Sequence, residues 1–244
     1  MFFLYSVSVF VYTALIKIAS LFNSKARRWT QGRKHWHDNL KQAVKNDHPW
    51  IWFHASSLGE FEQGRPVMEA FRQKYPQYKI LLTFFSPSGY EIRKNYDGAD
   101  YVCYLPADTP GNVRKFLVTV NPVMVFFIKY EFWFNYIHQL HLKNIPLYYF
   151  SVKFRPGQHF FKWYGGWFRE KLKEIDWIFV QDESSVNLLH GIGCDKCSLS
   201  GDTRFDRVLS VTRQKKSFPL IEQFAGDADV MVAGSTWPPD EEMM

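Results

Sequence analysis

A carboxylate stands where a predicted buried strand gives way to a helix. The apolar residues 50–53 predict the strand, small residues follow it, and a helical pattern runs from Glu60 to about Tyr75. Backbone N–H groups are free at such a helix start, and together with the helix dipole they favour an anion or a developing oxyanion. In open α/β sheets ligands bind at this end of the strands. Glu60 therefore lies at the mouth of a predicted crevice.

The same residues also fit a purely structural role. Ser57, Leu58, Gly59 and Glu60 have the pattern of a capping box, in which the Glu60 carboxylate only accepts a backbone N–H. On the local pattern alone, helix capping is the preferred interpretation of Glu60.

Three further strand ends carry polar residues. In residues 83–89, Ser86 can cap the next helix, and capping is its preferred role. Lys129 and Glu131 follow a strongly apolar strand, where a surface ion pair is an equally good explanation. Residues 201–206 follow the last strand and could be no more than a charged turn. The sequence has neither G-x-G-x-x-G nor G-x-x-x-x-G-K-[ST], which disfavours a dinucleotide site or a P-loop.

The positive charge of the chain is concentrated at its N-terminus. The 244 residues have a formal net charge of +6 and are 46% hydrophobic, as expected of a globular protein. Residues 1–47 hold eight Lys and Arg against Asp38 and Asp47, and the remaining chain balances 22 basic with 22 acidic residues. Because a nucleic-acid-binding domain more often spreads its charge over the folded surface, no nucleic-acid partner is expected. Cys194 and Cys197 lack further metal ligands, so they are predicted to be reduced structural thiols, and no metal site is expected.

Residues 1–22 are predicted to be a membrane anchor. Positions 1–16 are uncharged and make about 24 Å of helix, and counting through residue 22 gives about 33 Å if Lys17 snorkels. A single span and a deeply seated monotopic helix both remain open, and the alternative is a buried helix of a soluble domain. The basic residues 23–47 form a juxtamembrane arm for anionic lipids, or else a solvated connector. Their position after the apolar run places the body of the protein in the cytoplasm.

From residue 48 the pattern alternates between strands and helices. Short apolar runs predict strands near residues 50–54, 79–85, 100–105, 123–128, 145–151, 177–181 and 197–200. Helical patterns lie near residues 60–75, 88–96, 110–120, 132–143, 159–175 and 183–190. This predicts a doubly wound parallel sheet over residues 48–206. Residues 207–229 then form a connector, and a strand at 230–233 begins a second α/β domain in residues 230–244.

Taken in order, these motifs resemble the Kdo transferases (3-deoxy-D-manno-octulosonic acid transferases) of lipopolysaccharide synthesis. The resemblance covers essentially the whole chain. Besides the apolar N-terminus and the basic arm, the motifs that carry it are residues 54–60, 86–89, 131–133, 201–206 and 234–236. Each motif is weak alone, and the ordered set is specific.

The resemblance implies a GT-B glycosyltransferase with two Rossmann-like domains, of which only the first is complete here. It implies transfer of Kdo from CMP-Kdo to the 6′-hydroxyl of a tetra-acylated lipid A precursor (lipid IVA), with inversion and without a metal or other cofactor, at the cytoplasmic face of the inner membrane. Glu60 matches the family's general base, which reverses the preference for capping, and Glu131 and Arg204 match positions that support the transition state. The implied substrate-binding residues are Ser56, Ser57, Gly59, Ser86, Ser88, Gly89, Gly234, Ser235 and Thr236.

Two departures from the family pattern matter. The family often has Lys in place of Arg204, which keeps the charge and alters the geometry. Many members have an acid in place of Lys129, so Lys129 inherits no role. A non-catalytic membrane-tethered adaptor with a Rossmann-like domain, and another GT-B glycosyltransferase acting on a lipid, are the alternatives.

Overall fold

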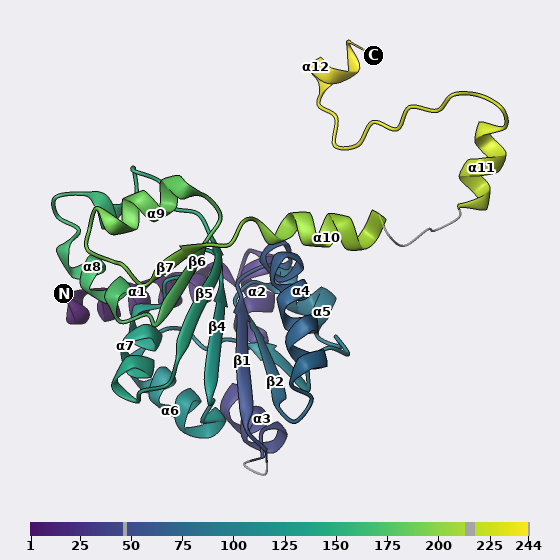
Figure 1. Ribbon diagram of the computed structural model, residues 1–244. Coiled ribbons are helices and arrows are strands. Elements are labelled where there is room, and N and C mark those ends of the chain that lie inside the picture. The colour runs from purple at the N-terminus through teal and green to yellow at the C-terminus, as the bar shows by residue number, and fades with distance from the viewer. Residues whose placement is uncertain (46–47, 213–217, 244) are drawn as a thin grey trace. The chain divides into compact units, whose positions relative to one another are not determined.

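The computed structural model describes residues 1–45, 48–212 and 218–243 (Figure 1). The chain divides into two compact units, Met1–Arg207 and Val208–Met244. The first unit contains the sheet and the N-terminal helices. The second contains only short helices and connecting segments among its described residues.

A parallel sheet forms the centre of the first unit (Figure 1). Its strands, in spatial order β3-β2-β1-β4-β5-β6-β7, are β1 (Trp50–Ala55), β2 (Lys79–Phe84), β3 (Tyr101–Tyr104), β4 (Met124–Ile128), β5 (Leu147–Val152), β6 (Trp177–Val180) and β7 (Cys197–Leu199). The register sets Phe53 of β1 beside Leu82 on one side and Phe126 on the other. The seven strands predicted from the apolar runs are thus confirmed.

Helices cover both faces of the sheet, and this explains the unbroken apolar runs. Alternate residues of β1 enter different cores: Ile51 packs with α4 (Leu58–Lys74) and Trp52 with α6 (Pro110–Val120). On the first face α5 (Pro87–Arg93) follows α4. The other face is covered by α3 (Trp36–Ala43), α6, α7 (Phe134–Leu142), α8 (Gly166–Lys173) and α9 (Glu183–His190). The doubly wound α/β fold is therefore confirmed.

The strand order creates a switch point between β1 and β4. From β1 the chain proceeds through β2 to β3 on one side, and from β4 it proceeds through β5 to β7 on the other. At such a point the loops after the two neighbouring strands diverge and leave a crevice at their carboxyl ends. Glu60 follows β1 and Glu131 follows β4, so both predicted carboxylates flank this crevice.

The predicted basic arm is folded into the first unit. It forms α2 (Ser24–Gln31) and α3, whose side chains Trp29 and Leu40 are buried. Arg33 donates from Nε to the Leu105 carbonyl at 2.9 Å and from Nη2 to the Phe85 carbonyl at 2.8 Å. The alternative of a solvated connector is therefore wrong, and Arg33 holds strand ends together instead of facing lipid.

One predicted helix is divided. Instead of a single helix over residues 159–175, the structure has a 3₁₀ turn, η1 (His159–Phe161), followed by α8. Gly165 lies at the division, so close to the carbonyl oxygen of His159 that a Cβ atom at this position would collide with it. The chain turns there and then resumes as a helix.

The predicted strand at 230–233 is wrong. The described part of the second unit has only helices as regular elements: the end of α10 (Thr203–Thr212), then α11 (Pro219–Ala225) and α12 (Pro238–Glu241). The side chains of Met231 and Val232 are 74% and 83% exposed. A strand needs a neighbour for its backbone N–H and C=O groups, and none is described for residues 230–233. A second domain over residues 230–244 stays a prediction.

A buried carboxylate joins the N-terminal helix α1 (Phe2–Ala19) to α7. Asp108 accepts hydrogen bonds from the backbone N–H groups of Asn135 and Tyr136, both at 3.0 Å, and from the Tyr5 hydroxyl at 2.6 Å. Burial raises the pKa of Asp108 to about 6.

We expect Asp108→Ala to lower the free energy of unfolding by about 2–4 kcal/mol, because three donors lose their acceptor and two of them cap a helix. Urea denaturation followed by circular dichroism measures this. Asp195→Ala, at an exposed position before β7, is the matched control and should stay within about 0.5 kcal/mol of the parent. An equally small effect of Asp108→Ala would contradict this role.

Candidate active site

Glu60 lies in the first turn of α4 and is partly buried. Its Oε2 accepts the backbone N–H of Ser56 at 2.5 Å, and the N–H of Ser57 also favours its ionised form. The Ser57 hydroxyl makes no capping hydrogen bond to any described residue. The serine half of the predicted capping box is therefore not formed, and the contact with the Ser56 N–H, one residue before the N-cap, fixes the Glu60 carboxylate at the end of β1.

Glu131 is the second acid of the crevice, and its negative charge changes the pKa of Glu60. It lies in the loop between β4 and α7, and burial raises its pKa. Burial and the negative charge of Glu131 together raise the pKa of Glu60 to about 7, against the opposing backbone N–H groups. The hydroxyl of Ser56 lowers the pKa of Glu131, although its Oγ has no well-aligned hydrogen-bond partner among the described residues. A carboxylate poised near neutral pH is what a general base requires.

The loop that carries Glu131 is held from two sides. Trp133 donates from Nε1 to His54 Nε2 at 3.1 Å, and His54 Nδ1 lies 2.9 Å from the hydroxyl of Thr83. Burial lowers the pKa of His54 to about 3, so the ring is neutral and Nε2 can accept. The Tyr149 hydroxyl donates to the Glu131 carbonyl at 2.8 Å. His54 is thus a structural residue, and it positions the loop.

Lys129 contributes a cation to the same crevice. Its backbone has φ of +66°, a left-handed conformation that is uncommon for a residue with a side chain. The positive charge of Lys129 lowers the pKa of Glu60, and no such influence on Glu131 is resolved. The structure therefore favours an electrostatic interaction of Lys129 with Glu60 over the predicted surface ion pair between Lys129 and Glu131.

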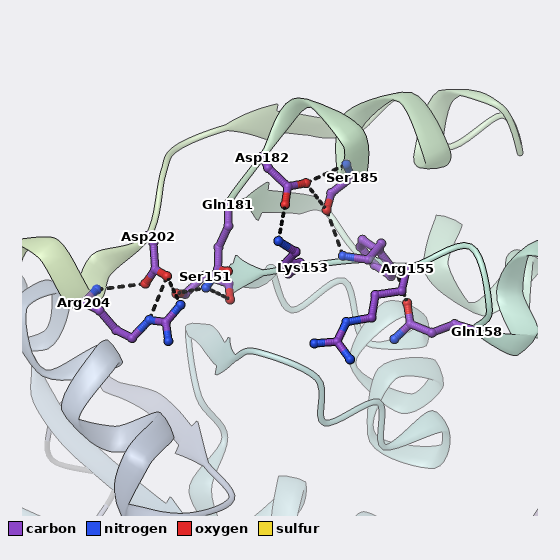
Figure 2. Close-up of polar contacts among 10 residues, drawn as sticks. Ser151, Lys153, Arg155, Gln158, Gln181, Asp182, Ser185, Asp202 and Arg204 are labelled. Atoms are coloured by element: carbon purple, nitrogen blue, oxygen red, sulfur yellow. Dashed lines mark hydrogen bonds and ion pairs between the residues drawn. The ribbon is translucent and has the colours of Figure 1, made fainter. Parts of the chain in front are cut away.

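Arg204 forms a charged turn with Asp202 at the start of α10 (Figure 2). Asp202 accepts from the Arg204 backbone N–H at 3.0 Å, from its Nε at 2.7 Å and from its Nη2 at 2.5 Å. The Arg204 side chain is 64% exposed. Its positive charge also lowers the pKa of Lys129, and the two cations follow the carboxyl ends of β7 and β4 respectively. The charged turn predicted as the structural alternative is present, and it leaves one edge of the guanidinium open to solvent.

A buried polar cluster lies beneath Asp202 and was missed by sequence reasoning. Its centre is Ser151 at the end of β5, with φ of +57°. Gln181 Nε2 donates to both the carbonyl and the hydroxyl of Ser151 at 3.1 Å (Figure 2). The hydroxyl of Thr203 also donates to Ser151 Oγ, at 3.1 Å. Ser151 in turn donates to Gln63 Oε1 of α4 at 3.4 Å. The cluster ties the start of α10 to the crevice, and the only signal for it is a serine at a strand end.

The second strand end is joined to the first by its backbone. Ser86 donates its N–H to the carbonyl of Ser56 at 2.7 Å, and its hydroxyl accepts the N–H of Ser88 at 3.3 Å, so the predicted capping by Ser86 is confirmed. Gly89 packs against the Phe84 ring, where a Cβ atom would collide with it. By contrast, a Cβ atom at Gly59 would meet no described atom within 4 Å, so Gly59 faces open space.

The three remaining predicted binding residues lie in the second unit. Gly234, Ser235 and Thr236 precede α12, and the Thr236 hydroxyl donates to Glu241 at 2.8 Å. Their role in binding substrate stays a prediction.

Two curated relatives of this chain share one name. The chain is similar to the 3-deoxy-D-manno-octulosonic acid transferase of Haemophilus influenzae, with 26% identity over 198 residues, which is 80% of this chain and 46% of that protein. It is 23% identical to the enzyme of that name from Chlamydia trachomatis serovar A, over 83% of this chain and 48% of the relative. The chain thus spans about half the length of the curated relatives that it matches.

Solved structures support the fold alone. UDP-GlcNAc 2-epimerase from Neisseria meningitidis, bound to UDP-GlcNAc, matches with a TM-score of 0.52 and 17% identity, over 73% of this chain and 53% of that one. Such neighbours have the GT-B-like architecture, and this chain covers part of it. Residues 27–207 match the sequence model of one protein family. The matched region includes β1 to β7 and both crevice acids. By that match the chain belongs to the 3-deoxy-D-manno-octulosonic-acid transferase (kdotransferase) family.

Proposed function

We propose that this chain is the acceptor side of a glycosyltransferase that transfers Kdo from CMP-Kdo to the 6′-hydroxyl of a lipid A precursor, with inversion. The observation that carries the proposal is the pair Glu60 and Glu131 at the switch point of a chain that belongs to this family. Glu60 is fixed by the Ser56 N–H and has a pKa near neutrality, which suits a general base.

The proposed step is a single displacement. The acceptor oxygen forms a bond to the anomeric carbon of Kdo, the bond from that carbon to the CMP phosphate oxygen breaks, and Glu60 takes the hydroxyl proton. Positive charge developing on the sugar is stabilised by the nearby carboxylate of Glu131. Lys129 and Arg204 lie on the same edge of the first unit and can stabilise negative charge on the leaving phosphate.

The proposed location is the cytoplasmic face of the inner membrane, where the lipid acceptor is anchored. Among the described helices, α1 is long and apolar enough to cross a membrane. Exposed basic residues follow it in α2, so anionic lipids of the inner membrane are the proposed partners.

The decisive test is the reaction itself. The full-length protein that the gene encodes is incubated with CMP-Kdo and the lipid A precursor, and the products are analysed by mass spectrometry. We expect the acceptor to gain the mass of Kdo and CMP to be released. Transfer only from another nucleotide sugar would favour a different GT-B glycosyltransferase, and no transfer from any donor would favour the non-catalytic adaptor.

Removal of divalent metals should leave the rate within about twofold of the untreated enzyme. Two protein cations are available for the leaving phosphate, so the proposed chemistry needs no Lewis acid. The measurement is initial rate in excess EDTA, with added Mg²⁺ as the restoring control. A loss of more than about tenfold that Mg²⁺ restores would contradict this part of the mechanism.

A further inference from the structure

The N-terminal helix α1 is attached to the first unit along nearly its whole length. Near its start, the ring of Phe2 packs edge-on against Trp167, with centroids 5.1 Å apart. The Tyr5 hydroxyl donates to Asp108, and the ring of Tyr12, two turns on, stacks on Phe85. The residues of α1 that face the first unit are Phe2, Tyr5, Ser6, Val9, Tyr12 and Ile16. Their spacing of three and four residues defines one face of a helix.

The opposite face of α1 is apolar and uncovered. We call it the free face, and its members are Phe3, Leu4, Val7, Phe10, Val11, Ala14, Leu15 and Ile18. Phe3 and Phe10 are 76% and 69% exposed, and no member carries a charge. Folded soluble domains rarely leave so large a contiguous apolar surface in water without a partner.

The attachment of α1 to the first unit limits the orientations that the helix can take in a membrane. Eighteen residues make about 27 Å of helix, which nearly reaches across the roughly 30 Å hydrocarbon core. If α1 crossed the bilayer in this fold, the polar groups that it contacts, including Asp108 and Asn135, would enter the hydrocarbon with it. Burying such groups in lipid is costly. A helix that lies flat places only the free face in lipid and leaves the docked face on the protein.

We propose that α1 lies in the plane of the membrane as part of the folded unit, with its free face inserted into an anionic bilayer. The charges around the free face support lipid over a second copy of the chain. Lys17 is the charged residue of α1, and Lys25, Arg27 and Arg28 of α2 are also exposed. Packing two copies through the free face would bring like charges together, whereas anionic head groups attract them.

This placement also sets the crevice beside the membrane. Along α1, Tyr5, Val9 and Tyr12 line a cavity with Phe85 and Trp133, which follow β2 and β4 at the carboxyl edge of the sheet. That edge also holds Glu60 and Glu131. This consequence for a lipid acceptor rests on the proposed function, whereas the in-plane position of α1 does not.

Depth measurements along one stripe of the free face test the proposal. Single cysteines replace Leu4, Val11 and Ile18, which lie two turns apart on nearly the same side of the helix. Each full-length variant is labelled with a bimane probe, bound to vesicles of phosphatidylglycerol and phosphatidylcholine, and quenched by lipids with nitroxides at different depths. The labelled parent protein gives the background of the native cysteines.

We expect all three probes to lie at the same shallow depth, within about 5–10 Å of the head-group boundary. A spanning helix would instead place the probe at Val11 deepest and those at Leu4 and Ile18 near opposite surfaces. That gradient would overturn the proposal, as would three probes that no lipid quencher reaches, because the free face would then be covered by protein.

A pair of charge substitutions gives an independent readout. Val11→Asp, on the free face, should weaken vesicle binding by about tenfold or more, because a carboxylate is driven out of the lipid interface. Val118→Asp is the matched control: Val118 is 63% exposed on α6, away from α1. Co-flotation with the same vesicles measures both, and sedimentation checks that each variant keeps the parent's oligomeric state. Equal binding of the two variants, or a dimer that Val11→Asp separates, would contradict docking of the free face on lipid.

Discussion

Glu60→Gln is expected to lower the turnover of Kdo transfer by about 10²–10⁴-fold, with little change in folding. The amide oxygen of Gln can still accept the Ser56 N–H, so the contact that fixes the start of α4 is kept. The amide cannot take a proton at neutral pH, so the proposed base is lost. Turnover and thermal midpoint are measured in the full-length protein.

The pH dependence of stability gives this variant a second signature. The folded-state pKa of Glu60, about 7, lies above the usual glutamate value of 4.5, so the free energy that its protonated form contributes to folding is lost as pH rises through about 7. Gln does not ionise. At pH 8 the Gln variant should therefore be at least as stable as the parent, whereas Glu60→Ala loses the hydrogen bond as well as the base.

Glu69→Gln is the matched control, because Glu69 lies on the same helix with its side chain 43% exposed and away from the crevice. It should leave turnover within about twofold of the parent. Near-normal turnover in Glu60→Gln would remove the base assignment and leave only the structural contact with Ser56. The non-catalytic adaptor would then be the better explanation of the crevice.

The parallel sheet could be predicted because a strand buried on both faces must be apolar at every position. Trp52 and Phe53 point to opposite cores and are both fully buried. The proximity of Glu60 and Glu131 was only implied, since it depends on β1 and β4 being neighbours. Strand order is a property of the whole fold, and residues more than seventy positions apart leave no local pattern for it.

The sequence-based predictions that the structure contradicts have a common physical cause. A local pattern describes what a segment could do alone, and tertiary contacts decide among the possibilities. Arg33 has the sequence signature of a lipid-facing cation, yet its guanidinium donates hydrogen bonds to the carbonyls of Leu105 and Phe85. Residues 230–233 have strand composition and are given no neighbour to pair with. At the division, Gly165 lies against the His159 carbonyl, a contact that no helical periodicity reveals.

The groups that position the crevice were the hardest to foresee. His54, Trp133 and Tyr149 come from three separate segments and meet only because their strands or loops are adjacent. Each would be assigned to the core by its type alone. Their hydrogen bonds hold the loop of Glu131, so part of the site depends on residues that never face the crevice.

Glu131→Gln is expected to change both the height and the position of the pH–rate profile. If Glu60 is the base, the rate rises with pH as Glu60 ionises, with an apparent pKa near 7 for the interacting pair. The negative charge of Glu131 raises the pKa of Glu60, so its removal should move this acidic limb to lower pH. The plateau rate should also fall by about 10²-fold, because the carboxylate proposed to stabilise the positively charged sugar is lost.

The two effects separate a charge role from a structural one. Gln at position 131 keeps the shape of the side chain, and its backbone carbonyl can still accept from Tyr149. Glu183→Gln, an exposed acid in the first turn of α9, is the control and should leave the whole profile unchanged. Kinetics of transfer at saturating CMP-Kdo between pH 5 and 9 provide the measurement. A lower plateau with the limb still near 7 would mean that Glu131 does not act on Glu60 through its charge, and an unchanged profile would exclude Glu131 from the site.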